Sequence, residues 1–365
     1  MRKFIVFLMC FGITVGLSSN VNTVNAASIP SPFPKLSTGV LYHGVHPSGG
    51  DGDETFKSFA YLTDYEKAVG KTAAWVYFSQ EWSQSSVSPT VKATSIRNHG
   101  SLPVIRLMFR SAAALNGREG ADPAWSLNNI ISGKFDKNID TWAAGAKTYG
   151  LPVLAEFGTE ANGDWFGWNG RWNGAGSLTY GDVKQYDGPE RFRVAYRHIV
   201  DRVRAAGANN VGFVFHVDAE DSPVTNWNKM ELYYPGASYV DVVGVSAYGS
   251  QSPIDGYTPT PFRTLMDTSY ARMSKIAPGK PLALLEFGST RGGRILPEMY
   301  AKSALTDITA RRWPNLIEFS WWNEGWQNDN NPAHDSEMRV QMLPKVATVF
   351  RDSLGKTNTL NVWKN

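Results

Sequence analysis

Eight short apolar runs recur along the chain and alternate with amphipathic stretches, and this pattern constrains the fold more than any other feature of the sequence. The runs are almost continuously apolar, which is typical of parallel strands that are buried on both faces. They occupy residues 40–45, 73–78, 102–109, 152–157, 211–216, 240–245, 281–287 and 316–321. Eight strands separated by helices indicate an α/β fold, and the strand count and chain length favour a closed (β/α)8 TIM barrel.

Helical periodicity between these runs supports the same fold. Apolar residues recur at helical spacing over residues 192–206, after Pro189 and before Gly207. A second helical pattern covers residues 139–146 and ends at Gly150. An open, doubly wound sheet is the competing architecture, but it normally carries a glycine-rich phosphate loop, and the glycines of 49–52 are followed by Thr55 where the third glycine should stand.

The amino terminus reads as an export signal. Arg2 and Lys3 precede an apolar stretch, and 24–26 resembles a small-residue cleavage site. We therefore expect residues 1–26 to be a signal peptide, 27–365 to be one catalytic domain, and the protein to be secreted. The stretch is too short and too broken by polar residues for a membrane span. The only cysteine, Cys10, falls in this signal.

Charge and aromatic content together favour a polysaccharide as partner. The formal net charge is +3 and basic residues are spread along the chain, so nothing indicates nucleic acid. Aromatic residues make up 13% of the chain, with 13 tryptophans, and such rings stack on the apolar faces of sugars. We expect a monomer without cofactor or metal, and we interpret 51–53 as a surface loop that lacks the further acids of a calcium site.

Two glutamates stand at strand ends, where barrel enzymes keep their active sites. Glu160 follows the fourth predicted strand in the segment 156–168, and Glu286 ends the seventh in Leu-Leu-Glu-Phe-Gly-Ser. Cleavage of a glycosidic bond needs one carboxyl group to protonate the leaving oxygen and another to attack or stabilise the anomeric carbon. Acids at these two strand ends meet that requirement.

The two segments resemble glycoside hydrolase family 26, best known for β-mannanases, in which an E-x-N-G-x-W-F segment holds the acid/base and an E-F-G segment the nucleophile. The resemblance runs from about residue 42 to 351. It implies that Glu160 is the acid/base and Glu286 the nucleophile. It also places Tyr248 beside the nucleophile and Trp321 under the bound sugar.

The other predicted substrate-binding residues come from the same strand ends. Trp165 and Phe166 follow the acid and could stack on sugar rings, and Asn162 belongs to the same motif. His216 ends the fifth predicted strand and could bind sugar hydroxyls. Trp321 and Trp322 point to opposite faces of a strand, so at most one lines the site; we keep both as candidates and prefer Trp321.

Three departures from the family concern specificity. Thr159 stands where the family usually has His, Ser246 where it has Asp, and Glu156 where it often has Arg. We expect Glu156 inside the barrel, because a buried carboxylate needs a partner, and Arg106 on the third predicted strand is our candidate. None of these changes removes a proton donor or a nucleophile.

The sequence thus predicts a secreted retaining β-glycoside hydrolase that acts on a β-linked polysaccharide, and the resemblance implies an endo-β-1,4-mannanase-like enzyme. A β-glucanase or β-xylanase of the same clan is one alternative. A carbohydrate-binding barrel without turnover is another, although it would have no reason to keep both glutamates. The two-step mechanism also predicts that the Glu160 and Glu286 carboxyl groups lie about 5 to 5.5 Å apart.

Overall fold

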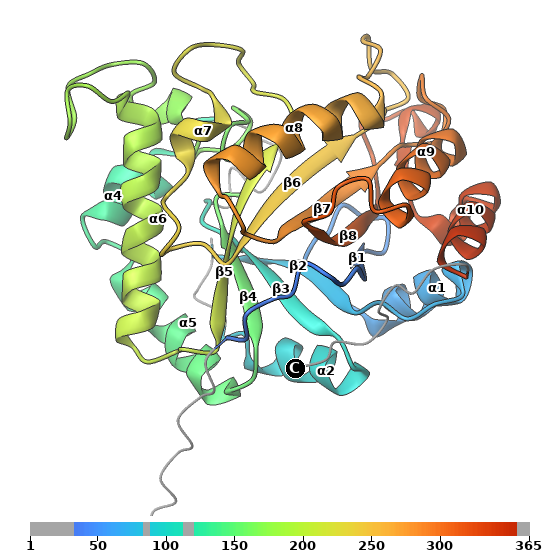
Figure 1. The fold of residues 1–365 in the computed structure, drawn as a ribbon, viewed down its shortest axis with the longest axis horizontal. Coiled ribbons are helices and arrows are strands. Elements are labelled where there is room, and N and C mark those ends of the chain that lie inside the picture. Colours follow the sequence, from blue (N-terminus) through green and yellow to red (C-terminus); the bar gives the residue numbers. More distant parts are fainter. Residues whose placement is uncertain (1–32, 83–87, 112–119, 356–365) are drawn as a thin grey trace, which may run out of the picture.

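The structure is a computed structural model that describes residues 33–82, 88–111 and 120–355. Its eight main strands form a closed parallel barrel in sequence order, with β8 returning to pair with β1 (Figure 1). The strands are β1 Tyr42–Pro47, β2 Trp75–Glu81, β3 Leu102–Met108, β4 Val153–Phe157, β5 Val211–Asp218, β6 Val242–Tyr248, β7 Leu282–Gly288 and β8 Leu316–Asn323. All eight predicted strands are present, so the barrel is confirmed and the open sheet is wrong.

Helices surround the barrel and connect successive strands (Figure 1). The longer ones are α1 Phe59–Val69, α2 Thr90–His99, α5 Asp136–Tyr149, α6 Asp187–Ala205, α8 Phe262–Ile276, α9 Pro297–Thr309 and α10 Pro344–Leu354. Two short helices, α4 Leu127–Ile131 and α7 Met230–Tyr233, and a small ribbon of β9 Gly325–Trp326 with β10 Ser336–Glu337 complete the regular structure. Both predicted helices are confirmed, as α6 and α5.

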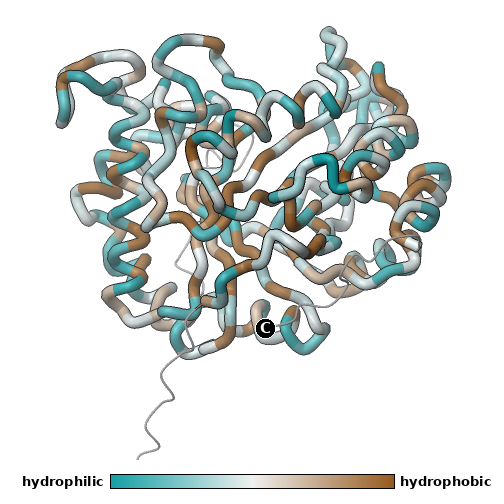
Figure 2. Tube along the Cα trace, viewed as in Figure 1, coloured by the Kyte–Doolittle hydropathy of each residue, from teal (hydrophilic) through white to brown (hydrophobic). Residues whose placement is uncertain are grey.

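Helix α6 shows why the predicted periodicity gives a helix on the outside of the barrel. Phe192, Ala195, Ile199 and Val203 are all buried on one of its faces, while its acidic first turn and basic last turn suit the helix dipole. Figure 2 shows the same division in colour, with hydrophobic stretches along the barrel and many hydrophilic ones on the surrounding helices. Gly207 follows with a φ of 79°, a conformation that glycine adopts without strain and that ends the helix.

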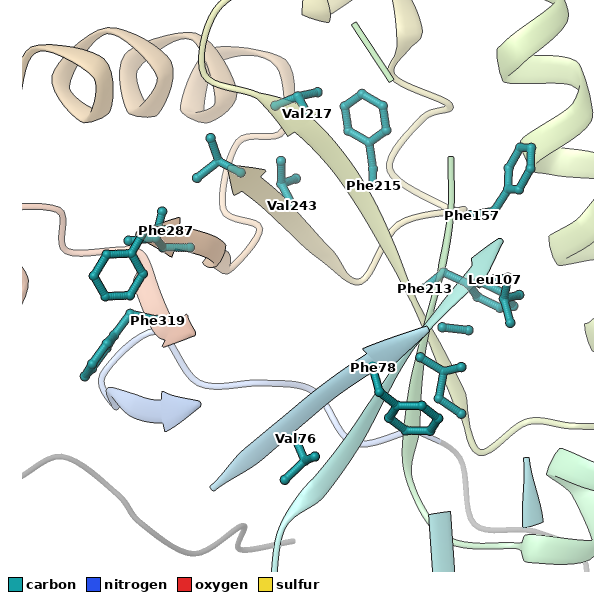
Figure 3. Close-up of a cluster of buried hydrophobic side chains, with 14 of the residues drawn as sticks. Val76, Phe78, Leu107, Phe157, Phe213, Phe215, Val217, Val243, Phe287 and Phe319 are labelled. Atoms are coloured by element: carbon teal, nitrogen blue, oxygen red, sulfur yellow. The ribbon is translucent and has the colours of Figure 1, made fainter. Parts of the chain in front are cut away.

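The apolar core lies between the strands and the helices. Side chains from five of the strands point to this outer face, among them Phe78, Phe157, Phe215, Phe287 and Phe319 (Figure 3). Burial of each such ring stabilises the fold by roughly 1.5 to 3 kcal/mol. The opposite face of the same strands points into the barrel and forms a second buried cluster.

The carboxyl ends of the inward-facing rows are polar, and their register brings them together. Arg106 lies beside Glu156 across β3 and β4, and Ser246 lies beside Glu286 across β6 and β7. Because side chains alternate along a strand, the residues that point into the barrel gather above its apolar interior. The fold therefore places a charged layer at one end of the barrel.

The predicted signal peptide 1–26, with Cys10, lies outside the described residues. Within residues 33–82, 88–111 and 120–355, every helix is too short or too polar to cross a lipid bilayer.

Candidate active site

A cavity of about 670 Å³ opens over the carboxyl ends of the strands, and both predicted catalytic glutamates line it. The same cavity is lined by further acids and aromatic rings, which are Glu54, Asp218, Glu220, Tyr257, Trp322, Glu324 and Trp326. The cavity is open at the place where barrel enzymes carry out their chemistry.

Glu286 is held at the end of β7 by two tyrosines. Tyr248 Oη lies 2.9 Å from Glu286 Oε2, and Tyr77 Oη lies 3.2 Å from Glu286 Oε1. Arg106 Nε is 3.7 Å from the same Oε1 atom. Burial raises the pKa of Glu286 to about 7, opposed by the charge of Arg106 and reinforced by that of Glu160. The predicted contact between Tyr248 and Glu286 is therefore present.

Glu160 follows β4 on a tight loop that aims its carboxyl group into the cavity. Its φ is 49°, an unusual value for a residue other than glycine and one that costs about 1 kcal/mol or more. Trp165 Nε1 donates a 2.7 Å hydrogen bond to Glu160 Oε2, and only 7% of Glu160 is exposed. Gly158 lets this loop approach α6, because a Cβ there would lie 2.4 Å from the Phe192 ring. Strain of this kind is common where a side chain must take a functional direction.

Replacing Glu286 by glutamine should stabilise the protein above neutral pH. A carboxyl group whose pKa rises from 4.5 to about 7 on folding destabilises the folded state increasingly as pH rises from 4.5 to 7, and by a constant amount above pH 7. We expect Glu286→Gln to raise the free energy of unfolding by up to about 3 kcal/mol at pH 8 and to have little effect at pH 4. Thermal unfolding at both pH values measures this difference.

The matched control is Glu231→Gln, because its hydrogen bond from Arg272 lowers the pKa of Glu231. This substitution should destabilise the protein modestly at pH 8 instead. A Glu286→Gln variant that unfolds at a lower temperature than the wild type at pH 8 would contradict the burial cost assigned to Glu286.

Arg106 is 2% exposed and has partners other than the one predicted. Its Nη1 lies 3.0 Å from Glu54 Oε2, and its Nε donates to the Thr159 hydroxyl at 3.2 Å. Burial by itself would raise the pKa of Glu54, but Arg106 and Arg110 lower it to about 2. Burial by itself would raise the pKa of Glu156, and the charge of Arg106 helps to lower it. The predicted direct pairing of the two is wrong, because the direct contacts of Arg106 are with Glu54, Thr159 and Glu286.

Glu156 lies inside the barrel, as predicted, and its partner is a histidine. His216 Nδ1 is 2.9 Å from Glu156 Oε1, and both residues are fully buried. Burial by itself would lower the pKa of His216, but the charge of Glu156 raises it above its usual value. The other nitrogen, Nε2, is 2.8 Å from the Ser246 hydroxyl. The prediction that His216 binds sugar is therefore wrong, because both of its nitrogens are used beneath the site.

Asn162 holds two loops together and does not line the cavity. Its Nδ2 donates to the carbonyls of Asp218 and Glu220 and to the Asp221 carboxylate, and its Oδ1 accepts from the Asp218 backbone at 2.8 Å. The residue is 0% exposed. Its predicted contact with substrate is wrong, because its amide group is engaged in fixing the loop after β5 against the loop of Glu160.

The preference for Trp321 over Trp322 is also wrong. Trp321 points outward, where it packs against Phe287 and Phe350 and donates to the Met338 carbonyl at 2.7 Å. Trp322 points into the barrel and lines the cavity, with its ring stacked on His46 at 3.7 Å between centroids. Because side chains alternate along a strand, only one of the two tryptophans can face the site. The register of β8 in the barrel determines that it is Trp322.

These two tryptophans form a matched pair for mutation. Trp322→Ala should raise KM by about tenfold, because it removes a cavity wall; it should also cost some stability, because the ring is buried against His46. Trp321→Ala should lower the free energy of unfolding by about 3 to 5 kcal/mol with a nearly unchanged KM in the folded fraction. Steady-state kinetics and thermal unfolding of both variants measure the contrast, and equal effects of the two substitutions on KM would argue against this placement.

Trp165 and Phe166 line the cavity beside Glu160, as the sequence predicts, and both are partly exposed. Their half-exposed rings lie where a sugar ring could stack. The order of strands around the barrel matches the fold that the resemblance implies.

Comparison with known families decides the relationship. A sequence profile described as Glycosyl hydrolase family 26 matches residues 88–340, more than half of the chain. The chain belongs to glycosyl hydrolase family 26. The resemblance seen in the two glutamate segments is therefore confirmed.

Curated relatives differ in their names, and the match covers only part of each. "Endoglucanase H" of Acetivibrio thermocellus is 28% identical over 238 residues, which are 63% of this chain and 23% of that protein. "Mannan endo-1,4-beta-mannosidase" of Bacillus subtilis strain 168 is 28% identical over 195 residues, 51% of this chain and 44% of that protein. The chain thus spans less than half the length of these relatives.

Solved family 26 structures share the fold. The catalytic domain of an endo-beta-1,4-mannanase from Bacillus sp. JAMB-750 has a TM-score of 0.61 at 17% identity and covers 91% of this chain and 93% of its own. A beta-mannanase from Bacteroides ovatus has a TM-score of 0.57 at 17% identity and covers 90% and 92%. At this identity the likeness shows the barrel architecture.

Several cavity residues of this family 26 chain were not predicted from its sequence: Glu54, Asp218, Glu220, Glu324 and Trp326. Asp218 ends β5, two residues beyond the predicted strand 211–216, and could have been noticed on that ground. Burial and the charge of Glu160 raise the pKa of Asp218 well above its usual value. Glu54 lies on a loop and Trp326 on the two-residue strand β9, and nothing in their local sequence indicates that they reach the cavity.

The acids of the 51–53 loop serve a surface ion pair. Asp51 and Asp53 both lie 2.9 Å from Lys57 Nζ. Within the described parts of the chain, no three His, Cys, Asp or Glu side chains are arranged to hold a metal ion.

Proposed function

We propose that this protein is a retaining β-glycoside hydrolase that cleaves a β-linked polysaccharide, in the manner of an endo-β-1,4-mannanase. The observation that carries the proposal is that Glu160, on the loop after β4, and Glu286, on β7 of a family 26 barrel, line one cavity at the carboxyl ends of the strands. Two carboxyl groups in one cavity provide the acid and the nucleophile that glycoside cleavage requires.

In this mechanism Glu286 attacks the anomeric carbon while protonated Glu160 donates its proton to the departing glycosidic oxygen. Glu160 then removes a proton from the water that releases the sugar from Glu286, so that two inversions give net retention. Tyr248 holds Glu286 Oε2, and Trp165 holds Glu160 Oε2, so that each carboxyl group keeps its direction. These contacts favour turnover over mere binding.

In the proposed mechanism the leaving group lies beside Glu160, and the retained sugar lies beside Glu286. The aromatic residues Trp165, Phe166, Trp322 and Trp326 line the same cavity. Aromatic walls suit the apolar faces of uncharged sugars. Arg106 faces several carboxyl groups in the cavity, so acidic side chains outnumber basic ones there. This excess of acids disfavours polysaccharides that carry carboxylate or sulfate groups.

Mannan is the first candidate substrate because relatives and structural neighbours include several named mannanases. A β-glucan is the second candidate. The longest match among the curated relatives quoted above is to Endoglucanase H, and Thr159 and Ser246 replace residues that the family usually has beside the catalytic glutamates. Both substitutions lie against the site, where they would alter contacts with the sugar.

A panel of soluble polysaccharides tests the proposal. Reducing ends should appear from galactomannan and glucomannan, and more slowly or not at all from mixed-linkage β-glucan, carboxymethylcellulose and β-xylans. Release from β-glucan alone would establish the second candidate. Binding without release from any polymer would identify a carbohydrate-binding barrel without turnover. We further propose that the protein acts outside the cell as a monomer, which protein fractionation and sedimentation measure.

A further inference from the structure

A second buried carboxylate lies close beneath the proposed nucleophile, and one tyrosine lies between the two. Tyr77 Oη is 2.6 Å from Glu156 Oε2 and 3.2 Å from Glu286 Oε1. Tyr77 and Glu156 are fully buried, and Glu286 is 3% exposed. A phenol carries a single proton, so Tyr77 can donate to only one of these carboxylates at a time.

The contacts of Glu156 indicate that it receives this proton as a hydrogen bond. A separation of 2.6 Å is typical of a hydroxyl that donates to an ionised carboxylate. The Thr159 hydroxyl and His216 also donate to Glu156. Burial by itself would raise the pKa of Glu156, but His216 and Arg106 lower it below its usual value. Glu156 is therefore an ionised carboxylate with three donors.

Glu286 then faces an oxygen lone pair of Tyr77 at its Oε1 atom. That contact becomes a hydrogen bond only when Glu286 carries a proton on Oε1 and donates it to Tyr77. Other charged and polar groups also face Glu286 from the surrounding strands and loops. The acids are Glu156, Glu160 and Asp218, and the bases are Arg106 and His216. Besides Tyr77, the hydroxyl group is that of Tyr248, which donates to Glu286.

We propose that Glu156 is a positioning residue that withholds the Tyr77 proton from Glu286, so that Tyr77 acts as an acceptor and favours the protonated form of the nucleophile in the free enzyme. The inference rests on the proposed function, in which Glu286 must be ionised to attack. It assigns a role to Glu156, which stands where family 26 often has arginine. Glu156 acts through Tyr77 and does not touch the substrate.

The variant Tyr77→Phe shows whether Tyr77 accepts a hydrogen bond from Glu286 or donates one to it. The substrate is a 2,4-dinitrophenyl β-glycoside of the sugar that the wild type cleaves best. Because this leaving group departs without a proton, the acidic limb of the pH profile of kcat/KM reports ionisation of Glu286. Removal of an acceptor for protonated Glu286 should move the limb to lower pH by about one unit. A limb that moves to higher pH would show that Tyr77 donates to Glu286, and it would overturn the proposal.

Glu156→Gln supplies a second, independent test. It removes a negative charge near Glu286 and frees the Tyr77 proton, so the acidic limb should again move to lower pH by about one unit. The matched control is Glu318→Gln, which changes a fully buried carboxyl group in the same barrel that accepts a hydrogen bond from the Ser320 hydroxyl. This control should leave the limb in place. A purely structural Glu156 would lower kcat/KM equally at every pH, and that result would also overturn the proposal.

An infrared titration separates this inference from the proposed function. The carbonyl band of protonated Glu286, identified by its absence in Glu286→Ala, should disappear at lower pH in Tyr77→Phe than in the wild type. This readout needs no turnover. Absence of hydrolysis with the expected band shift would reject the proposed function alone, whereas hydrolysis with an unshifted band would reject the role of Glu156 alone.

Discussion

Glu286→Ala should abolish turnover on every substrate, by a factor on the order of 10⁵ or more. Without a nucleophile no glycosyl-enzyme forms, and good leaving groups cannot compensate for its loss. The measurement is kcat on both a polysaccharide and an activated aryl glycoside. The change deletes a buried carboxyl group that is costly to bury, so the variant should fold, and its thermal unfolding serves as the control.

Glu160→Ala should have a strongly substrate-dependent effect. Loss of a general acid costs roughly 10² to 10⁴ in rate on a polysaccharide, but much less on an aryl glycoside whose leaving group departs without a proton. Added azide should then accelerate the second step, because it attacks the glycosyl-enzyme without a general base. The product should be a β-glycosyl azide if configuration is retained.

Azide rescue in the Glu286 variant with an α-product, and none in the Glu160 variant, would show that the two roles are reversed. The separation of about 5 to 5.5 Å between the two carboxyl groups remains a prediction of the same mechanism.

Arg106→Met should have the largest effect on stability among single substitutions at the site. Arg106 is buried against Glu54 at 3.0 Å and Glu286 at 3.7 Å. Its removal leaves Glu286 without this cation and leaves Glu54 with the more distant Arg110, whose Nη2 is 3.8 Å away. Breaking a buried pair of this kind costs about 3 to 5 kcal/mol. The acidic limb of kcat/KM should move to higher pH, because Arg106 lowers the pKa of Glu286.

The double variant Arg106→Met with Glu54→Gln tests the cause of this loss. It should recover a large part of the stability, because the second change removes the carboxylate that the first leaves without its nearest cation. Arg110→Met is the matched single control, since Arg110 is 15% exposed and its short contact is to Glu81. A double variant as unstable as Arg106→Met alone would mean that Arg106 stabilises the barrel through packing, as in its contact with the Trp322 ring.

Much of the architecture could be predicted because its signals are local. Each strand is a short apolar run, and helices such as α6 carry a one-sided apolar pattern that ends at a glycine. Glu160 and Glu286 could be found because the barrel fold confines active-site residues to strand ends and because their flanking residues form a recognisable motif.

The wrong predictions share a physical cause. They concern residues whose surroundings depend on strand register and on partners that are distant in sequence. Trp321 points outward, both nitrogens of His216 are hydrogen-bonded, and Asn162 contacts a second loop. Arg106 and Glu156 lie side by side in the register of β3 and β4, yet the longer side chain reaches Glu54 while the shorter one meets His216.

The sequence by itself determined the eight-stranded barrel, the pair of glutamates and the family, because periodicity and motif are properties of neighbouring residues. Only the tertiary structure decided which tryptophan faces the cavity and which of the buried charges pair with one another. Those outcomes follow from distances of a few ångströms between side chains on different strands, and no pattern along a single strand encodes them.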